Sequence, residues 1–274
     1  MKIQTYHIDA FSNKLFGGNP ASVCVLEKWL PDNYLQAIAT ENNLPATAFL
    51  VRNNKEYSIR WFTSEYEIDL CGHGTLASGY VIFNYLETEL QQVNLNSPAG
   101  LLRVKQEDEL ITLDFPVKDL EKCTLLPLLE QGLGQMPKEI YRHKTERCLA
   151  VFDNEKQVKQ IKPNMQILNQ LPYRGIIITA RGEQADFVSR VFYPRKLLSE
   201  DAVTGSSHCL LVPYWAEKLN KSQLHSRQLS HRGGDLFCEL QEGRVFISGK
   251  AVMYMHGSIL LEGIDLGNLG NVEH

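Results

Sequence analysis

The sequence lacks a long apolar run, an excess of positive charge and an apolar leader. No apolar stretch reaches the roughly 18 to 20 residues that a membrane-spanning helix needs. The formal net charge is −4, whereas nucleic-acid-binding domains usually present a basic face. The opening residues, MKIQTYHIDAF, lack the apolar core of a signal peptide. We therefore expect a cytoplasmic protein that binds neither nucleic acid nor membrane.

Closely spaced cysteines are also missing. The six cysteines stand at wide, irregular intervals, without the Cys-x-x-Cys spacing of common zinc sites. A chain of 274 residues is long enough to fold without disulfides. We expect reduced thiols and no bound metal. We also expect Cys24, Cys148 and Cys238 to be buried as small apolar side chains in strand-like segments.

The main feature that is present is an internal repeat. Residues 59–86 and 189–219 each begin with an Arg-x-Phe strand, which holds Arg60 in the first copy and Arg190 in the second. In both copies a polar loop with acidic residues follows, and then a glycine and a hydroxyl residue open an apolar helix. These residue pairs are Gly74-Thr75 and Gly205-Ser206.

The repeat continues downstream without a gap. Residues 96–116 match residues 230–250 at an offset of 134 positions. So steady a register indicates that the chain is duplicated. We therefore predict two halves, residues 1–118 and 119–258, and a tail at 259–274.

The two central helices of the repeat are apolar around most of their circumference. Their sequences are TLASGYVIFNYL (75–86) and SSHCLLVPYWAEKL (206–219). A surface helix shows one apolar stripe, so a helix that is apolar all round must be surrounded. Segments such as GIIITA and LITLDF predict several strands per half. The predicted fold class is α+β: a duplicated two-domain fold, each half a curved sheet wrapped around a central apolar helix.

The starts of these two helices predict the position of a ligand cleft. If the two related halves face each other, both helix N-termini open into one cleft. Free backbone N–H groups and the positive end of the helix dipole favour a carboxylate there. Gly72, Gly74 and Gly205 let the backbone approach a ligand closely. The expected ligand is a small carboxylate.

Four segments carry a family resemblance: HIDAFSNKLFGGNPASVCVL, TENNLPATAFL, RWFTSEYEIDLCGHGTLASG and SEDAVTGSSHC. Together they resemble, in order and over about residues 3 to 257, the PhzF-like phenazine-biosynthesis family. The resemblance implies the diaminopimelate epimerase fold, with the site between two pseudo-symmetric halves. It also implies an isomerase that moves a proton without a cofactor, and a homodimer.

The same resemblance implies particular site residues. It assigns the acid/base role to Glu41, and it places further site residues at His73, Asp201 and Ser206. Asn19, in the turn GGNP, also lies in a segment that resembles the family.

The chemistry of these residue types is compatible with those roles. Glu41 ends the predicted helix PDNYLQAIATEN, where the helix dipole disfavours a carboxylate anion, as suits a residue that both takes and gives a proton. His73 can donate a hydrogen bond or shuttle a proton, and Asp201 can orient it or hold a substrate amine. Thr75 and Ser206 either bind the substrate carboxylate or cap their helices.

Cys71 leaves a second enzyme class open. Its block CGHG resembles the first cysteine block of diaminopimelate epimerase and related racemases, which use two thiols. Aligning Gly74 with Gly205 places Cys71 opposite Ala202, so the second thiol is missing. Cys71 itself either contacts the substrate or is a buried neutral thiol. The alternatives to an isomerase are therefore a cysteine-dependent amino-acid racemase or epimerase, and a small-molecule binding protein without turnover.

Overall fold

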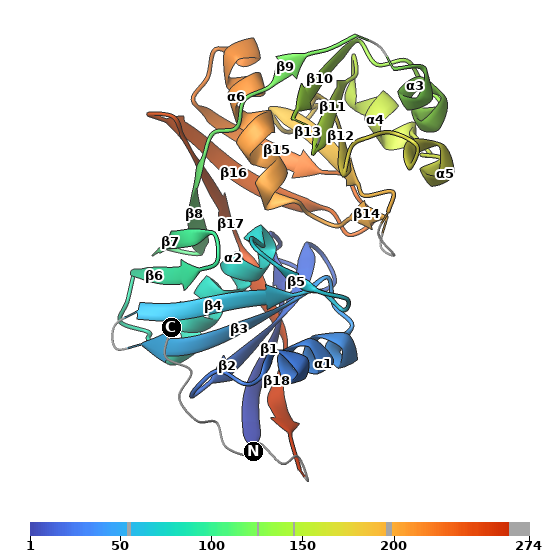
Figure 1. Ribbon diagram of the computed structural model, residues 1–274. Coiled ribbons are helices and arrows are strands. Elements are labelled where there is room, and N and C mark those ends of the chain that lie inside the picture. The colour runs from blue at the N-terminus through green and yellow to red at the C-terminus, as the bar shows by residue number, and fades with distance from the viewer. Residues whose placement is uncertain (54–55, 125, 145, 196–198, 263–274) are drawn as a thin grey trace.

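The computed structural model describes residues 1–53, 56–124, 126–144, 146–195 and 199–262, which form two lobes (Figure 1). Within these ranges, no helix combines the length and the apolar character needed to cross a membrane.

The first half contains one outer helix, one central helix and eight strands. Its elements are β1 (Lys2–Ala10), β2 (Asn19–Leu26), α1 (Asp32–Asn42), β3 (Ala46–Asn53), β4 (Glu56–Phe62), β5 (Glu67–Ile68), α2 (Gly72–Val81), the π-helical turn η1 (Ile82–Leu86), β6 (Gln92–Ser97), β7 (Gly100–Glu107) and β8 (Leu110–Pro116).

The rest of the described chain repeats this order with additional helices. Its elements are β9 (Glu121–Lys122), α3 (Pro127–Leu133), β10 (Glu139–His143), β11 (Arg147–Val151), α4 (Glu155–Gln160), α5 (Met165–Leu168), β12 (Gly175–Arg181), β13 (Phe187–Phe192), β14 (Glu200–Asp201), the 3-10 turn η2 (Gly205–Ser207), α6 (His208–Leu219), β15 (Gln223–Gln228), β16 (Gly234–Gln241), β17 (Arg244–Gly249) and β18 (Ala251–Leu260).

The strand pairings confirm the predicted repeat. Strand β2 runs parallel to β3, β3 antiparallel to β4, and β4 parallel to β6, which continues antiparallel to β7 and β8. Strands β11, β12, β13, β15, β16 and β17 pair in the same order and with the same directions. The two sheets join where β8 lies antiparallel to β17. There Leu113 faces Ile247, which is 134 positions later. A residue that faces its own counterpart marks the pseudo-twofold axis.

The two central helices are enclosed by their sheets, as the sequence predicts. In α2, every residue except His73 and Tyr80 is buried. A Cβ added at Gly79 would lie 2.8 Å from Val104 Cγ1, so the helix packs very closely against β7. In α6 the buried residues likewise lie on several faces, among them Leu211, Val212 and Trp215.

Helix α6 continues through a proline because another segment compensates for the lost hydrogen bond. Pro213 has no backbone N–H and cannot donate to the carbonyl of Cys209. The backbone N–H of Lys118 donates to that carbonyl instead, at 3.0 Å. The segment that connects the halves thus completes the second central helix.

One edge strand crosses between the halves. Strand β18 follows β17 of the second half but pairs with β1 of the first, and its counterpart β9 follows β8 across the predicted boundary and pairs with β10. The predicted boundary at residue 258 therefore falls inside β18, and residues 259–260 of the predicted tail form the end of that strand. Residues 263–274 of that tail lie outside the described residues. The division at residue 118 stays a prediction.

Candidate active site

The N-terminal ends of the two central helices meet at two glycines. A Cβ built on Gly72 would lie 3.5 Å from the Cα of Gly205, and one built on Gly205 would lie 3.7 Å from the Cα of Gly72. These are ordinary van der Waals distances, so the two helix starts lie close together at these glycines. A ligand at this place would lie beside the glycines, against the residues that flank them.

Asn19 joins the two halves at this point. Its Nδ2 donates to Asp201 Oδ1 at 2.7 Å and to the carbonyl of Val203 at 2.8 Å, and it lies 3.3 Å from His73 Nδ1. The side chain is fully buried, and its Oδ1 has no hydrogen-bond partner among the described residues. The turn before Asn19 requires a glycine at position 18. Gly18 has φ +63°, and a Cβ there would lie 2.1 Å from the carbonyl oxygen of Ala10, so a larger residue could not hold the chain in this conformation.

A thiol and an imidazole form the first side of the site. Cys71 is the N-cap residue of α2 and is 4% exposed. Its Sγ lies 3.6 Å from Nδ1 and 3.7 Å from Nε2 of His73. A proton can therefore be shared between the thiol and the ring at the start of the helix.

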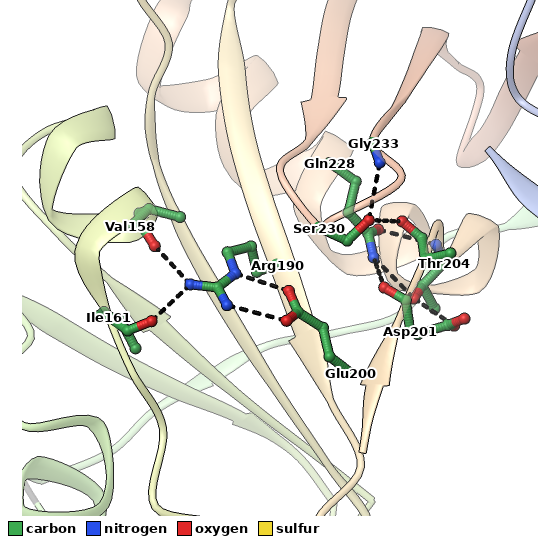
Figure 2. A network of polar contacts seen from close by, with 10 residues as sticks. Val158, Ile161, Arg190, Glu200, Asp201, Thr204, Gln228, Ser230 and Gly233 are labelled. Atoms are coloured by element: carbon green, nitrogen blue, oxygen red, sulfur yellow. Dashed lines mark hydrogen bonds and ion pairs between the residues drawn. The ribbon is translucent and has the colours of Figure 1, made fainter. Parts of the chain in front are cut away.

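A carboxylate and a hydroxyl form the second side (Figure 2). Thr204 Oγ1 donates to Asp201 Oδ2 at 2.6 Å. The buried amide of Gln228 holds both residues, because its Nε2 donates to the carbonyl of Asp201 at 2.8 Å and its Oε1 accepts from the N–H of Thr204 at 2.9 Å. The Asp201 carboxylate thus has one oxygen on Asn19 and the other on Thr204.

Equivalent arginine forks support the two sides. In the second half, Arg190 donates through Nε and Nη2 to the two oxygens of Glu200, at 2.7 and 3.0 Å (Figure 2). In the first half, Arg60 donates in the same way to Glu67, at 2.6 Å in both bonds. Each fork ties the short strand that leads to a helix start, β14 or β5, to the long strand beside it.

The structure thus brings together Asn19, Cys71, Gly72, His73 and Asp201 with Gly205. The hydroxyl of Thr75 donates to the carbonyl of Cys71 at 2.6 Å, inside the first helical turn. Gly74 lies behind the thiol, since a Cβ there would be 3.1 Å from the Sγ of Cys71.

Ser206 and Glu41 make no such contacts. The Oγ of Ser206 is partly exposed and has no hydrogen-bond partner in the described part of the chain. Glu41 lies in the last turn of α1, as predicted, but its side chain is exposed. Among the described residues, no hydrogen bond or ion pair joins Glu41 to any other side chain. Its acid/base role stays a prediction.

Three further residues shape the site without having been predicted from the sequence: Thr204, Gln228 and Arg232. Arg232 Nη2 forms an ion pair with the buried Asp9 at 2.6 Å, and its guanidinium also donates to the carbonyls of Gly17 and Gly18. It thereby fixes the turn before Asn19. Thr204 lay within a family-like segment, whereas Gln228 and Arg232 carried no local signal, because their partners are distant in the sequence.

The strand register corrects the alignment of the two helix starts. Trp61 and Val191 directly follow the equivalent arginines Arg60 and Arg190, so they hold equivalent places. Trp61 pairs with Ile68 and Val191 pairs with Asp201, and Ile68 and Asp201 are therefore equivalent. Three residues further on, Cys71 therefore corresponds to Thr204 and not to Ala202. The alignment from sequence was wrong because the β13–β14 loop is longer than the β4–β5 loop.

A cavity of about 450 Å³ lies between the two halves near the site. Tyr193 lines it together with Tyr66 of the first half. Burial raises the pKa of Tyr193, and the nearby negative charge of Asp201 contributes in the same direction. The cavity does not include the residues at the helix starts, so it is a neighbouring space and not the site itself.

Two like halves, each a sheet around a central helix, define the diaminopimelate-epimerase-like fold. The structure of a predicted epimerase from Pseudomonas aeruginosa superposes with a TM-score of 0.73 over 95% of this chain and 100% of that one, at 17% identity, which shows the fold alone. Residues 8–257 match the model of the phenazine biosynthesis-like protein family (PhzC-PhzF), and the chain belongs to this family.

Two relatives support the assignment. An uncharacterized isomerase of Pseudomonas aeruginosa is 45% identical over 261 residues, which cover 95% of this chain and 100% of the relative. The crystal structure of a phenazine biosynthesis protein PhzF family member from Enterococcus faecalis has a TM-score of 0.92 and 44% identity, over 95% of this chain and 100% of that one. The resemblance and the fold class predicted from the sequence are confirmed, and the protein is an enzyme of the PhzF-like isomerase type.

Proposed function

We propose that this isomerase moves a proton at carbon on a small carboxylate-bearing substrate, at the site where the two helix starts meet. The observation that carries the proposal is the position of Asn19. Its Nδ2 lies 3.3 Å from His73 Nδ1 and donates to Asp201 at 2.7 Å, which joins both halves in one polar cluster. Acid/base chemistry between the halves needs such a cluster.

His73 is the group in this cluster best suited to carry the proton. An imidazole has an ordinary pKa near 6.5 and can both accept and donate a proton near neutral pH. Its ring is partly exposed, unlike the thiol of Cys71 and the amide of Asn19 beside it. The substrate carboxylate would be bound at the helix starts, where the dipoles favour an anion, by the Oγ of Ser206.

The resemblance assigns the acid/base role to Glu41 instead. Its exposed carboxylate has no contact with the cluster among the described residues, so the geometry favours His73. One measurement separates the two assignments, because each side chain can be replaced while the other is left intact.

The test is deuterium incorporation into a panel of small carboxylates incubated with enzyme in D₂O, followed by NMR. Wild type, His73→Asn, Glu41→Gln and Cys71→Ser are compared under the same conditions. We expect carbon-bound exchange that His73→Asn abolishes and Glu41→Gln retains. Loss in Glu41→Gln with retention in His73→Asn would restore the glutamate as the acid/base.

A thiol-dependent racemase is the second candidate. The burial of Cys71 at a helix start, 3.6 Å from His73, favours it. In that case Cys71→Ser would abolish exchange and the wild type would invert the substrate's stereocentre. A protein that only binds would show carboxylate-dependent shifts in its NMR spectrum but no exchange with any compound.

We also propose that the chain forms a homodimer through an exposed apolar face near β18. The rings of Phe16 and Tyr254 pack edge to face, 5.8 Å between centroids. Phe16 is 67% exposed and Tyr254 57% exposed, with Leu15 and Met255 also exposed. Exposed apolar side chains that pack against one another, as Phe16 and Tyr254 do, are typical of an interface.

A further inference from the structure

We infer that Thr204 is the second-half counterpart of Cys71 in the site, so that the two sides of a bound substrate meet chemically different groups. One side presents the thiol and imidazole of Cys71 and His73. The other presents the hydroxyl and carboxylate of Thr204 and Asp201. The inference deepens the proposed function and rests on it for its catalytic consequence, but not for the geometry.

The geometry follows from the strand register and from the contact of the helix starts. Ile68 and Asp201 hold equivalent places in the β4–β5 and β13–β14 ladders. Cys71 and Thr204 each follow by three residues, and each directly precedes one of the two neighbouring glycines, Gly72 and Gly205. Both residues have extended backbone at the N-cap of their turn, with φ −137° at Cys71 and −112° at Thr204.

Thr204 is held in place through every polar atom it has. Its N–H donates to Gln228 Oε1 at 2.9 Å, and its Oγ1 donates to Asp201 Oδ2 at 2.6 Å. Its carbonyl accepts from Ser207 Oγ at 2.7 Å and from His208 Nδ1 at 3.1 Å. The residue is 4% exposed. Cys71 is buried to the same degree.

The chemical difference between the two sides restricts the reaction. A thiol has an ordinary pKa near 8.5, whereas an alcohol is a far weaker acid, and the hydroxyl proton of Thr204 is already donated to Asp201. Inversion of a stereocentre needs a proton acceptor on one face of the carbon and a donor on the other. This site has proton-carrying groups of suitable acidity on the side of Cys71 and His73. On the other side, both oxygens of the Asp201 carboxylate already accept hydrogen bonds, from Asn19 and from Thr204. Proton transfer is therefore restricted to one face.

A cross-linking experiment tests the geometry without reference to activity. Thr204→Cys and the matched control Ala202→Cys are treated with diamide, which takes two electrons and two protons as two thiols form a disulfide. A disulfide needs Cα atoms within about 7 Å. We expect Thr204→Cys to link its new thiol to Cys71, identified in the non-reduced peptide digest by mass spectrometry. The link should be absent in Ala202→Cys and in the double variant Thr204→Cys with Cys71→Ser.

A link in Ala202→Cys but not in Thr204→Cys would overturn the assignment, and so would the absence of a link in both. Because the new thiol cannot reproduce the hydroxyl bond to Asp201, the fold of each variant is compared with wild type by thermal unfolding. If Thr204→Cys does not fold, the inference is tested on the wild type alone, by the stereochemistry of its deuterium exchange.

The stereochemistry of exchange tests the consequence. For any chiral carboxylate that the wild type exchanges in D₂O, deuterium should enter with retention, seen as an unchanged enantiomer ratio by chiral chromatography. Racemisation at the rate of exchange in the wild type would contradict one-sided transfer. A complete lack of exchange would count against the proposed function, while the cross-link would still decide the place of Thr204.

Discussion

At the scale of single residues, Asn19 is the side chain on which the site depends most. Replacement by Ala removes the donor shared by Asp201 and the carbonyl of Val203. Exchange in D₂O should fall by roughly 100-fold, because misplacement of reacting groups by about 1 Å has effects of that size. The polar groups left unsatisfied should lower the free energy of unfolding by about 1 to 3 kcal/mol.

The measurements are single-substrate exchange rates and urea unfolding. The matched control is Asn84→Ala, whose exposed side chain bonds, among the described residues, to its own helical turn and to Gln106. Equal losses in Asn19→Ala and Asn84→Ala would contradict the role of Asn19.

The buried thiols give a second prediction at this scale. Burial raises the pKa of Cys24 to about 11, of Cys148 to about 12 and of Cys209 to about 11. The thiolate is the reactive form, so at pH 8 these three should not react with Ellman's reagent in the native protein. All six should react in guanidinium, since all six are free. Rapid native labelling of Cys24, located by peptide mass, would contradict this account.

The chemistry of single residues was partly readable from the sequence. Motifs placed His73 in the first turn of a central helix and Asp201 just ahead of the other, where the structure has them. The sequence did not identify Gln228, because a glutamine in a strand gives no sign that its amide reaches residues 201 and 204 across the fold. It placed Ala202 opposite Cys71, where the structure has Thr204.

At the scale of elements, His208 couples the stability of α6 to pH. Burial lowers its pKa to about 4. In the unfolded chain the ring takes up a proton below its ordinary pKa near 6.5, whereas in the folded chain it stays neutral, bonded to the carbonyl of Thr204 and to Ser226. The unfolded state therefore binds more protons between pH 6.5 and 4. Stability is full above pH 6.5 and falls as the pH drops toward 4.

The expected loss between pH 7 and pH 5 from this residue is about 2 kcal/mol. Urea unfolding of wild type and His208→Gln at both pH values measures it, and the variant should lose less on acidification. An equal pH dependence in the two proteins would show that another group is responsible.

The elements themselves were largely predictable, but their connections were not. An apolar face located α1, apolar character all round located α2 and α6, and the steady offset located the repeat. The two-residue strands β5 and β14 were not predicted, because a strand of that length has no periodicity. Their register could not be predicted either, since loops of unequal length separate them from the strands they join.

At the scale of the whole molecule, the exposed face at Phe16 and Tyr254 sets the expected assembly. Introduction of charge by Phe16→Glu with Tyr254→Glu should convert a dimer to a monomer, because charged groups in an apolar interface are costly to desolvate. Sedimentation velocity measures the change. The control Tyr66→Glu alters another exposed aromatic residue and should leave the assembly unchanged. A monomeric wild type would refute the proposed dimer.

The sequence predicted the division of the molecule into two halves but not the strands at the edges of their sheets. Two helices that are apolar all round required two enclosing sheets, and both are present. The pairing of β18 with the first half was not predicted, because β18 has no counterpart of equal length in the first half. Its partner β1 is also at the opposite end of the chain.

The pairing of β18 has a consequence for how the chain folds. Because β18 belongs to the second half but completes the sheet that contains β1, the first half is not finished by its own residues. Expressed without residues 251–260, the first half would leave the edge of β1 unpaired and open to another chain.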